Sequence, residues 1–229
     1  MRKLILFAFI MSAFAISASS ANAQVLRTIL DRMDGNNKTL QSLVADVTMV
    51  KTDQVLGESD TTYGDTSYLP KSPQTKNQRY VRINWTRPVQ EQIAVIGDKY
   101  ELYRPRLNQV IQGTTGKAQN SSKAAGALAF MSMSKDELKA NYTVTYIGEE
   151  SVSGAVSTWH LQLTPKTKTS YKLAEIWVDK DGMPRQAKIT ENNNDTTTVL
   201  LSNIKKNDKI SGDTFRLAYD KKKVKVIQG

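Results

Sequence analysis

The sequence predicts a mainly β protein: one antiparallel sheet, strongly curved or nearly closed, with helices on one side. Three observations lead to this class. Most of the chain after residue 43 consists of short segments in which apolar and polar residues alternate, as in strands with one buried face. Turns of a few residues separate about ten or eleven such segments, whereas parallel strands would need long crossovers. Two helical patterns interrupt them and can cover the apolar face.

Residues 1–23 have the features of a secretory signal peptide. Two basic residues begin the chain, an uncharged apolar run follows, and Ala21-Asn22-Ala23 supplies the small residues of a cleavage site. Cleavage after Ala23 would leave a single domain over residues 24–229. We find no other stretch long and apolar enough to span a membrane.

The composition narrows the function classes. The chain is 39% hydrophobic and 24% charged, the balance of an ordinary folded domain. Residues 1–23 hold two of its 32 basic residues and none of its 22 acidic ones, so the mature chain carries a net charge of +8. In an exported protein this excess favours anionic membranes or acidic partners over nucleic acid. Cysteine is absent, which excludes disulfides, thiol catalysis and an N-terminal lipid anchor.

The elements follow from the local patterns in chain order. Apolar residues with helical spacing predict a first helix over residues 25–33. Asp34-Gly35 predicts its end, and the pattern allows a second turn from there to Leu43. Period-two alternation predicts strands at residues 43–50, 58–69, 79–86, 91–96, 99–104, 107–112, 142–148, 156–163, 173–179, 184–191 and 196–204. After Phe215 the tail holds one more short pairing segment at most.

A second helical region lies in the middle of the chain. Residues 124–133 are apolar and compact, and Ser134 to Glu137 matches the capping box that starts a short helix ending at Asn141. This region and the first helix are the available covers for the apolar face of the sheet. One interpretation is a closed core, and the other is a lid over a cavity for an apolar ligand.

The strand that begins at Arg79 places an arginine in an apolar row. Alternation puts Arg79 on the same face as Val81, Ile83 and Trp85, while Arg82 lies on the other face. A charged side chain among apolar residues is costly unless it is paired. Arg79 therefore either extends to water at the strand end or holds a mobile element through its guanidinium.

Catalytic motifs are missing. His160 is the only histidine, and the chain has no cysteine, no nucleophile elbow and no phosphate-binding loop. The segment from Asp179 to Gly182 resembles the start of a calcium loop but is interpreted as a turn, because the remaining ligands are absent. The sequence thus predicts a protein that is not an enzyme and that takes no cofactor or metal.

Several segments in order resemble the outer-membrane lipoprotein carrier protein family, LolA. They are the strand from Arg79 to Trp85 followed by Pro88, the segment from Gly97 to Pro105, Leu161 to Pro165, Ile176 to Pro184, and Asn203 to Phe215. Two features depart from the family. Arg82 replaces a residue that is usually apolar, and the loop at residues 70–77 is longer than usual.

The resemblance implies an incomplete antiparallel barrel covered by a helical lid. It implies a periplasmic, monomeric carrier that takes acylated lipoprotein cargo from an inner-membrane releasing transporter and passes it to an outer-membrane receptor. Arg79 matches the family's lid-latching arginine, bonded toward residues 124–133 in the empty state. With the alternation pattern, the resemblance assigns the acyl-chain cavity to Val47, Met49, Val81, Ile83, Trp85, Val95, Leu128, Phe130, Met131, Met133, Trp159 and Leu161.

Other functions of the same fold stay open. A periplasmic sensor or adaptor could use the cavity to detect lipid or mislocalised lipoprotein, and a relative could carry another lipid or a glycolipid. An exported hydrolase is disfavoured because no nucleophile and base pair is found in the sequence. The identity of the cargo, the number of acyl chains and the partner proteins do not follow from the residues.

Overall fold

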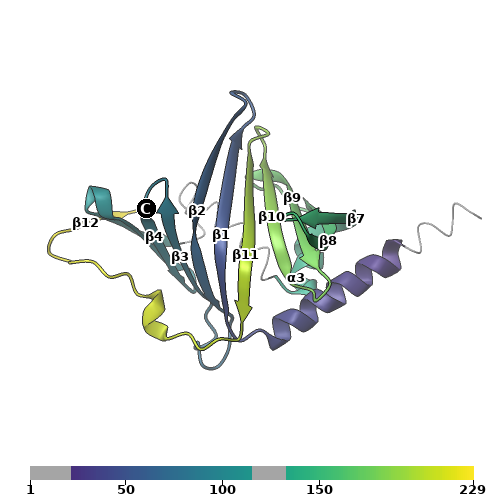
Figure 1. Ribbon diagram of the computed structural model, residues 1–229, viewed down its shortest axis with the longest axis horizontal. Coiled ribbons are helices and arrows are strands. Elements are labelled where there is room, and N and C mark those ends of the chain that lie inside the picture. Colours follow the sequence, from purple (N-terminus) through teal and green to yellow (C-terminus); the bar gives the residue numbers. More distant parts are fainter. Residues whose placement is uncertain (1–21, 115–132) are drawn as a thin grey trace, which may run out of the picture.

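The computed structural model describes residues 22–114 and 133–229. Within them, twelve strands form one sheet in the order β12-β6-β5-β4-β3-β2-β1-β11-β10-β9-β8-β7, so that β12 and β7 are its two edges (Figure 1). The strands are β1 (Leu43–Asp53), β2 (Glu58–Leu69), β3 (Tyr80–Arg87), β4 (Glu91–Ile96), β5 (Lys99–Arg104), β6 (Gln109–Thr114), β7 (Tyr142–Val152), β8 (Val156–Pro165), β9 (Tyr171–Asp179), β10 (Pro184–Glu191), β11 (Thr196–Lys206) and β12 (Lys225–Gln228).

The helical elements are short apart from the first. An N-terminal helix covers residues 22–39, and α3 (Lys135–Asn141) precedes β7. Two 3-10 turns, η1 (Pro105–Leu107) and η2 (Gly212–Phe215), lie before β6 and after β11. Among the described residues, no helix is long and apolar enough to cross a membrane.

The predicted fold class is confirmed: the molecule is mainly β, with one open and largely antiparallel sheet. All eleven predicted strands are present, and the tail adds β12 as a twelfth. This last strand departs from the antiparallel rule, because it pairs with β6 in parallel. Parallel strands need a long connection, and the chain between β6 and β12 supplies one, because it includes α3 and β7–β11.

The predicted end of the first helix at Asp34-Gly35 is wrong: the turn allowed beyond it is part of the same helix, which continues to residue 39. A glycine inside a helix costs about 1 kcal/mol. Contacts beyond it offset this cost. The buried side chain of Asn36 donates to the Met183 sulfur at 3.5 Å and accepts from the Lys206 ammonium at 3.3 Å.

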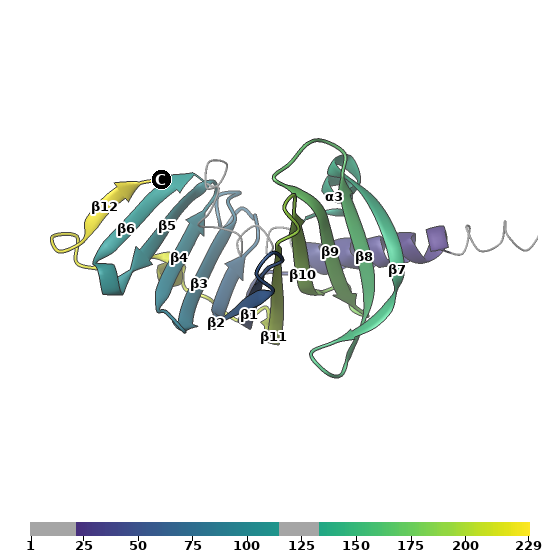
Figure 2. The same ribbon diagram turned by 90° about the horizontal axis from the view of Figure 1, so that it is seen from above.

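The N-terminal helix covers the β7–β10 part of the sheet (Figure 2). Its side chains Ile29, Leu30 and Met33 are 0–1% exposed and belong to the same hydrophobic cluster as the inward residues of β8, β9 and β10. Each such buried side chain contributes about 1.5–3 kcal/mol. The helix is therefore held mainly by its apolar stripe.

The β9–β10 turn contacts the helix backbone directly. Gly182 lies in this turn with a φ of +81°, and a Cβ there would stand 2.3 Å from the carbonyl carbon and oxygen of Arg32. The Arg32 guanidinium donates to the Lys180 carbonyl at 2.7 Å. Asp179 shapes the turn, because its Oδ1 accepts from the backbone N–H groups of Asp181 and Met183 at 3.0 and 2.9 Å.

The chain after β11 packs on the opposite face of the sheet, an arrangement that the sequence analysis did not foresee. Phe215 in η2 is 1% exposed, and its ring contacts the ring of Tyr80 edge-on, with 5.4 Å between their centroids. Tyr219 packs against Tyr103 at the same centroid distance. We call residues 207–224 the tail segment. It connects β11 to β12 across the outer side of β3–β6.

Arg82 explains why the tail segment lies there. Its side chain is 8% exposed and donates to the Asn84 amide oxygen at 2.6 Å, the Gln92 amide oxygen at 3.0 Å and the Arg216 carbonyl at 3.1 Å. Burial lowers the pKa of Arg82, and the nearby Asp65 carboxylate opposes this effect. A buried guanidinium needs such partners, so the family departure at this position is matched by a polar network under the tail segment.

Replacing Gly182 with alanine should displace the N-terminal helix. The variant Gly182→Ala meets a positive φ, which costs about 1–2 kcal/mol, and a collision with the helix backbone, which adds about 1–3 kcal/mol. The control Gly154→Ala has a similar φ of +79° but open space around its Cβ. Chemical denaturation should show the larger loss of unfolding free energy for Gly182→Ala. Equal losses in the two variants would contradict the close contact.

Candidate functional site: the apolar face of the sheet

The candidate site is the face of the sheet on which the apolar residues of successive strands line up. The strand register makes these rows continuous: Val81 of β3 lies opposite Val95 of β4, and Ile83 lies opposite Ile93. The row continues from β3 across β2 to β1. Gly64 of β2 lies between Trp85 of β3 and Val47 of β1. A Cβ on Gly64 would stand 2.1 Å from the Asn84 carbonyl oxygen, so glycine permits this close pairing.

Nine of the predicted cavity residues lie in or against one hydrophobic cluster. Val47, Met49, Ile83, Trp85, Val95 and Leu161 are buried members, whereas Val81, Met133 and Trp159 are partly buried and pack on it. The remaining three, Leu128, Phe130 and Met131, lie outside the described residues. The structure therefore brings the described members together, and their role as a cavity stays a prediction.

The N-terminal helix divides this face into two parts. Over Trp159 in β8, the Arg32 guanidinium lies 5.1 Å from the ring centroid, so this end of the face is covered by the helix. Figures 1 and 2 place the helix beside β7–β10 and away from β3–β6. We call the β1–β5 part, with Val47, Ile83, Trp85 and Val95, the candidate cavity face. The sequence pattern did not separate the two parts.

The end of the predicted lid is tied to the N-terminal helix. The Met133 carbonyl accepts from the side-chain amide of Asn37 at 3.0 Å, and the Lys135 ammonium pairs with the carboxylate of Asp31. The predicted capping box is confirmed: the Glu137 backbone N–H donates to the Ser134 hydroxyl, and the Ser134 N–H donates to the Glu137 carboxylate. This junction therefore fixes the start of α3 against the N-terminal helix.

Arg79 lies at the entry to β3, directly before Tyr80, and its carbonyl accepts from the Gly97 N–H at 2.9 Å. Arg79 is partly buried, and its charge acts on Glu137 in α3. The pKa of Glu137 is lowered first by its hydrogen bond from the Ser134 N–H, and further by the positive charges of Arg79 and Lys71. The predicted latch residue thus lies within electrostatic reach of the helix that follows the predicted lid.

Two tyrosines place a hydrogen-bonded pair of hydroxyl groups at the apolar face. The hydroxyl groups of Tyr142 and Tyr171 are 2.6 Å apart, and both rings pack in or against the hydrophobic cluster. Burial raises the pKa of Tyr171, and the hydrogen bond with Tyr142 raises it further. No local pattern in the sequence indicates this pair, because the two residues are 29 positions apart.

His160 lies on the opposite face and serves a structural role in the sheet. Its ring stacks on Trp177, with 4.3 Å between the centroids, and its two nitrogens face the carboxylates of Glu150 and Glu175 at 3.3 and 3.0 Å. In the part of the chain that the structure describes, no group of three histidine, cysteine, aspartate or glutamate residues could hold a metal ion.

Comparisons with known proteins agree with this arrangement. A family described as "Outer membrane lipoprotein carrier protein LolA" matches residues 76–218. These residues run from the loop before β3 to the tail segment and so include α3 and most of the sheet. Among curated protein sequences, no significant match is found.

Solved structures share the fold at low sequence identity. An uncharacterized conserved protein from Thermus thermophilus has a TM-score of 0.56 at 12% identity, covering 90% of this chain and 99% of that one. MucB has a TM-score of 0.54 at 12% identity, and the match covers 84% of this chain but 62% of MucB. A LolA superfamily protein from Nitrosomonas europaea has a TM-score of 0.45 at 13% identity, covering 83% and 97%.

A double-mutant cycle should detect the interaction between Arg79 and Glu137. We expect Arg79→Leu and Glu137→Gln to show a coupling of about 0.2–1 kcal/mol at neutral pH, the range of exposed ion pairs. Because the folded-state pKa of Glu137 is below its ordinary value of 4.5, this contribution is complete above 4.5. It is lost as the pH falls through the lowered pKa.

The measurement is urea denaturation of the four proteins at several pH values. Asp136→Asn provides the control, since Asp136 is also an acidic residue in the first turn of α3. It should show no coupling with Arg79→Leu. Zero coupling for Glu137 at neutral pH, or coupling that persists after Glu137 is protonated, would contradict the placement of Arg79.

Proposed function

Because the chain belongs to the LolA family of outer membrane lipoprotein carrier proteins, we propose that it carries lipoproteins across the periplasm by binding their acyl chains against the candidate cavity face. Proteins of this family are periplasmic carriers and are not enzymes. In this proposal residues 1–23 direct export and are removed after Ala23. Cargo is received from an inner-membrane releasing transporter and is passed to an outer-membrane receptor.

The observation that carries the proposal is the open, one-sided sheet. Its apolar rows continue across β1–β5, while the N-terminal helix lies over the β7–β10 end. Val47, Ile83 and Trp85 in these rows are buried, so an acyl chain reaches them only when whatever covers them moves aside. An apolar face of this size stays covered, either by a ligand or by a movable segment of the chain.

The transfer uses binding alone. Moving an acyl chain into water costs about 0.8 kcal/mol for each methylene group, which makes a free aqueous intermediate prohibitive for long chains. Exchange between a membrane and an apolar cavity avoids most of this cost, so affinity stays moderate and release is possible. Residues 124–133 act as the lid in this proposal, and its open and closed states must differ by only a few kcal/mol.

Arg79 holds the lid closed over the empty cavity. The effect of its charge on Glu137 of α3 supports this role, because the lid ends where α3 begins. The planar guanidinium offers several donors to backbone carbonyls in a fixed geometry. Cargo entry then has to break these bonds, and their recovery on closing helps to expel the cargo.

A second candidate is a periplasmic sensor or adaptor with the same fold, because the similar protein MucB was solved in complex with MucA(peri). The match to this chain spans 62% of MucB. A sensor would bind lipid without delivering it. Transfer of cargo to a purified outer-membrane receptor therefore separates the two functions.

A hydrophobic fluorescent probe should bind the mature protein and be displaced by acylated lipoprotein. Placing an amide in the cavity face by Val81→Gln should weaken probe binding about tenfold, since an uncompensated polar group costs about 1–3 kcal/mol. Val226→Gln is the control, because Val226 lies half-exposed in the edge strand β12. Probe binding that survives saturating lipoprotein, or that is equal in both variants, would contradict the proposal.

Removing the latch should trap the cargo. In Arg79→Leu, the loss of charge-assisted bonds of about 1.5–3 kcal/mol shifts the lid toward open. The variant should accept lipoprotein but release it to the receptor at least about tenfold more slowly, because closing on the empty cavity no longer competes. Arg79→Lys should be intermediate, since an ammonium lacks the planar fork.

The matched control is Arg87→Leu in the same strand, where the guanidinium lies over the exposed ring of Tyr63. Its release rate should equal that of the wild type. Release at the wild-type rate by Arg79→Leu would show that Arg79 is a residue at the strand end without a latch role.

A further inference from the structure

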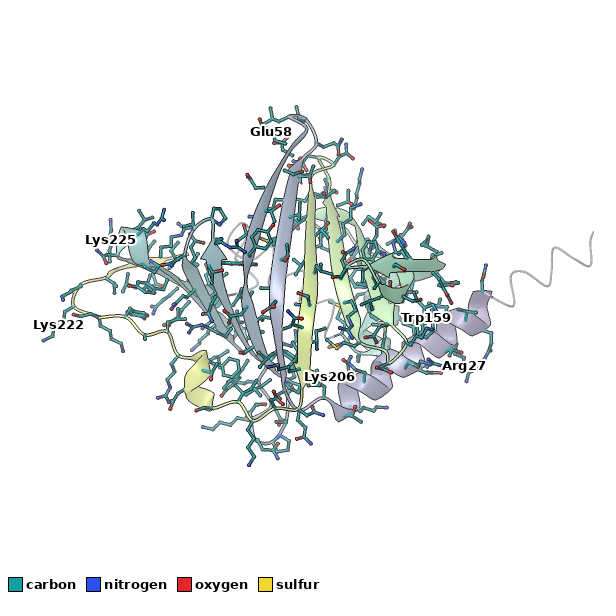
Figure 3. All side chains as sticks on the ribbon, in the orientation of Figure 1. Arg27, Glu58, Trp159, Lys206, Lys222 and Lys225 are labelled. Atoms are coloured by element: carbon teal, nitrogen blue, oxygen red, sulfur yellow. The ribbon has the colours of Figure 1, made fainter. Side chains whose placement is uncertain are left out.

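The tip of the β1–β2 hairpin exposes two adjacent aliphatic side chains. Val55 is 87% exposed and Leu56 is 68% exposed, the highest values for large hydrophobic residues in residues 22–114 and 133–229. The hairpin stands out from the rest of the sheet, and Glu58, labelled in Figure 3, marks its end. Single exposed hydrophobics are common, but an adjacent pair at the end of a projection offers a small apolar wedge.

The tip is held in one conformation by its own hydrogen bonds. The Asp53 side-chain oxygen accepts from the N–H groups of Val55 and Leu56, each at 2.9 Å. The N–H of Gly57, which has a φ of +68°, donates to the Asp53 carbonyl at 3.0 Å. The N–H of Gln54 donates to the Asp195 carboxylate at 3.0 Å and so joins the tip to the β10–β11 turn.

These bonds satisfy the backbone donors of the tip. All four backbone N–H groups from Gln54 to Gly57 have partners inside the protein. An unsatisfied backbone group is expensive to place in a lipid environment. The wedge can therefore approach a lipid surface without losing hydrogen bonds at these N–H groups, and its side chains gain from the burial of apolar surface.

The charges around the tip restrict the kind of membrane. The carboxylates of Asp53, Glu58 and Asp195 lie in the tip or in the turn bonded to it. The nearby cations lie further back: Lys51 is opposite Asp60 of β2, and the Lys172 ammonium donates to the Asn194 side chain in the β10–β11 turn. Lys222, in the basic run 221–223, lies at the left side of the view in Figure 3, away from Glu58 at the top. Local repulsion at the tip thus opposes anionic lipid despite the positive net charge of the chain.

We propose that the β1–β2 hairpin tip is a membrane-contact site, in which Val55 and Leu56 insert among zwitterionic lipid headgroups. The ammonium groups of phosphatidylethanolamine or phosphatidylcholine then lie beside the carboxylates of Asp53, Glu58 and Asp195. This inference goes beyond the carrier function and does not depend on the identity of the cargo, because the tip is separate from the candidate cavity face.

The test uses the mature protein and vesicles of phosphatidylcholine and phosphatidylethanolamine. Vesicle flotation should show that Val55→Ser with Leu56→Ser lowers the partition coefficient by about a hundredfold, on the order of tenfold for each lost aliphatic side chain. Leu107→Ser is the matched control, because Leu107 is 63% exposed but lies alone in η1. Its partition coefficient should equal that of the wild type.

A second readout locates the inserted residue. The chain contains no cysteine, so Val55→Cys or Leu107→Cys can each be labelled at a single site with an environment-sensitive dye. The dye at position 55 should shift to the blue on neutral vesicles and less so when phosphatidylglycerol is added. The dye at position 107 should not respond.

Three outcomes would overturn the proposal. The dye at position 55 could stay in water, the tip variant could bind vesicles as tightly as the wild type, or anionic lipid could strengthen the shift at position 55. A tip variant that binds vesicles normally but fails to exchange cargo with a purified partner would assign the tip to protein docking instead. The hydrophobic fluorescent probe is also tested on the tip variant. Normal probe binding shows that the candidate cavity face is intact, so a change in vesicle binding is then not a failure of the carrier function.

Discussion

A sheet with one apolar face and two unpaired edges has to be covered, and this constraint organises the molecule. The described strands run from β12 at one edge to β7 at the other without closing into a barrel. The N-terminal helix covers the β7–β10 end, where Gly182 lets the β9–β10 turn reach the helix backbone. The remaining apolar rows, on β1–β5, are where a carrier would hold an acyl chain. A cover over these rows is stabilised by the apolar surface that it keeps from water.

Strand β3 connects the two faces of the sheet. Its inward side contributes Ile83 and Trp85 to the candidate cavity face, and its outward side carries Arg82 under the tail segment. Because a strand is stiff along its length, the polar network at Arg82 fixes the same backbone that presents the cavity residues and follows Arg79. The tail segment is thus a brace behind the candidate site, rather than a loose end.

Local patterns were enough to predict the strands and the capping box, because alternation and the pairing of Ser134 with Glu137 depend on neighbours in sequence. The extent of the first helix and the course of the tail segment depend on distant contacts, such as those of Asn36 with Met183 and Lys206. The unusual Arg82 was the one signal for the tail, since a charge within a sheet implies partners. The division of the apolar face required knowing where the helix lies, and no spacing in the sequence encodes that position.

The central claim is that the candidate cavity face holds acyl chains during transport. The most direct measurement is native mass spectrometry of the mature protein purified from the periplasm without detergent, followed by identification of the bound species. We expect a complex with acylated lipoprotein, enriched in Arg79→Leu and depleted in Val81→Gln. A protein that is free of acylated species in all three forms, when purified from cells that make its cargo, would contradict the claim.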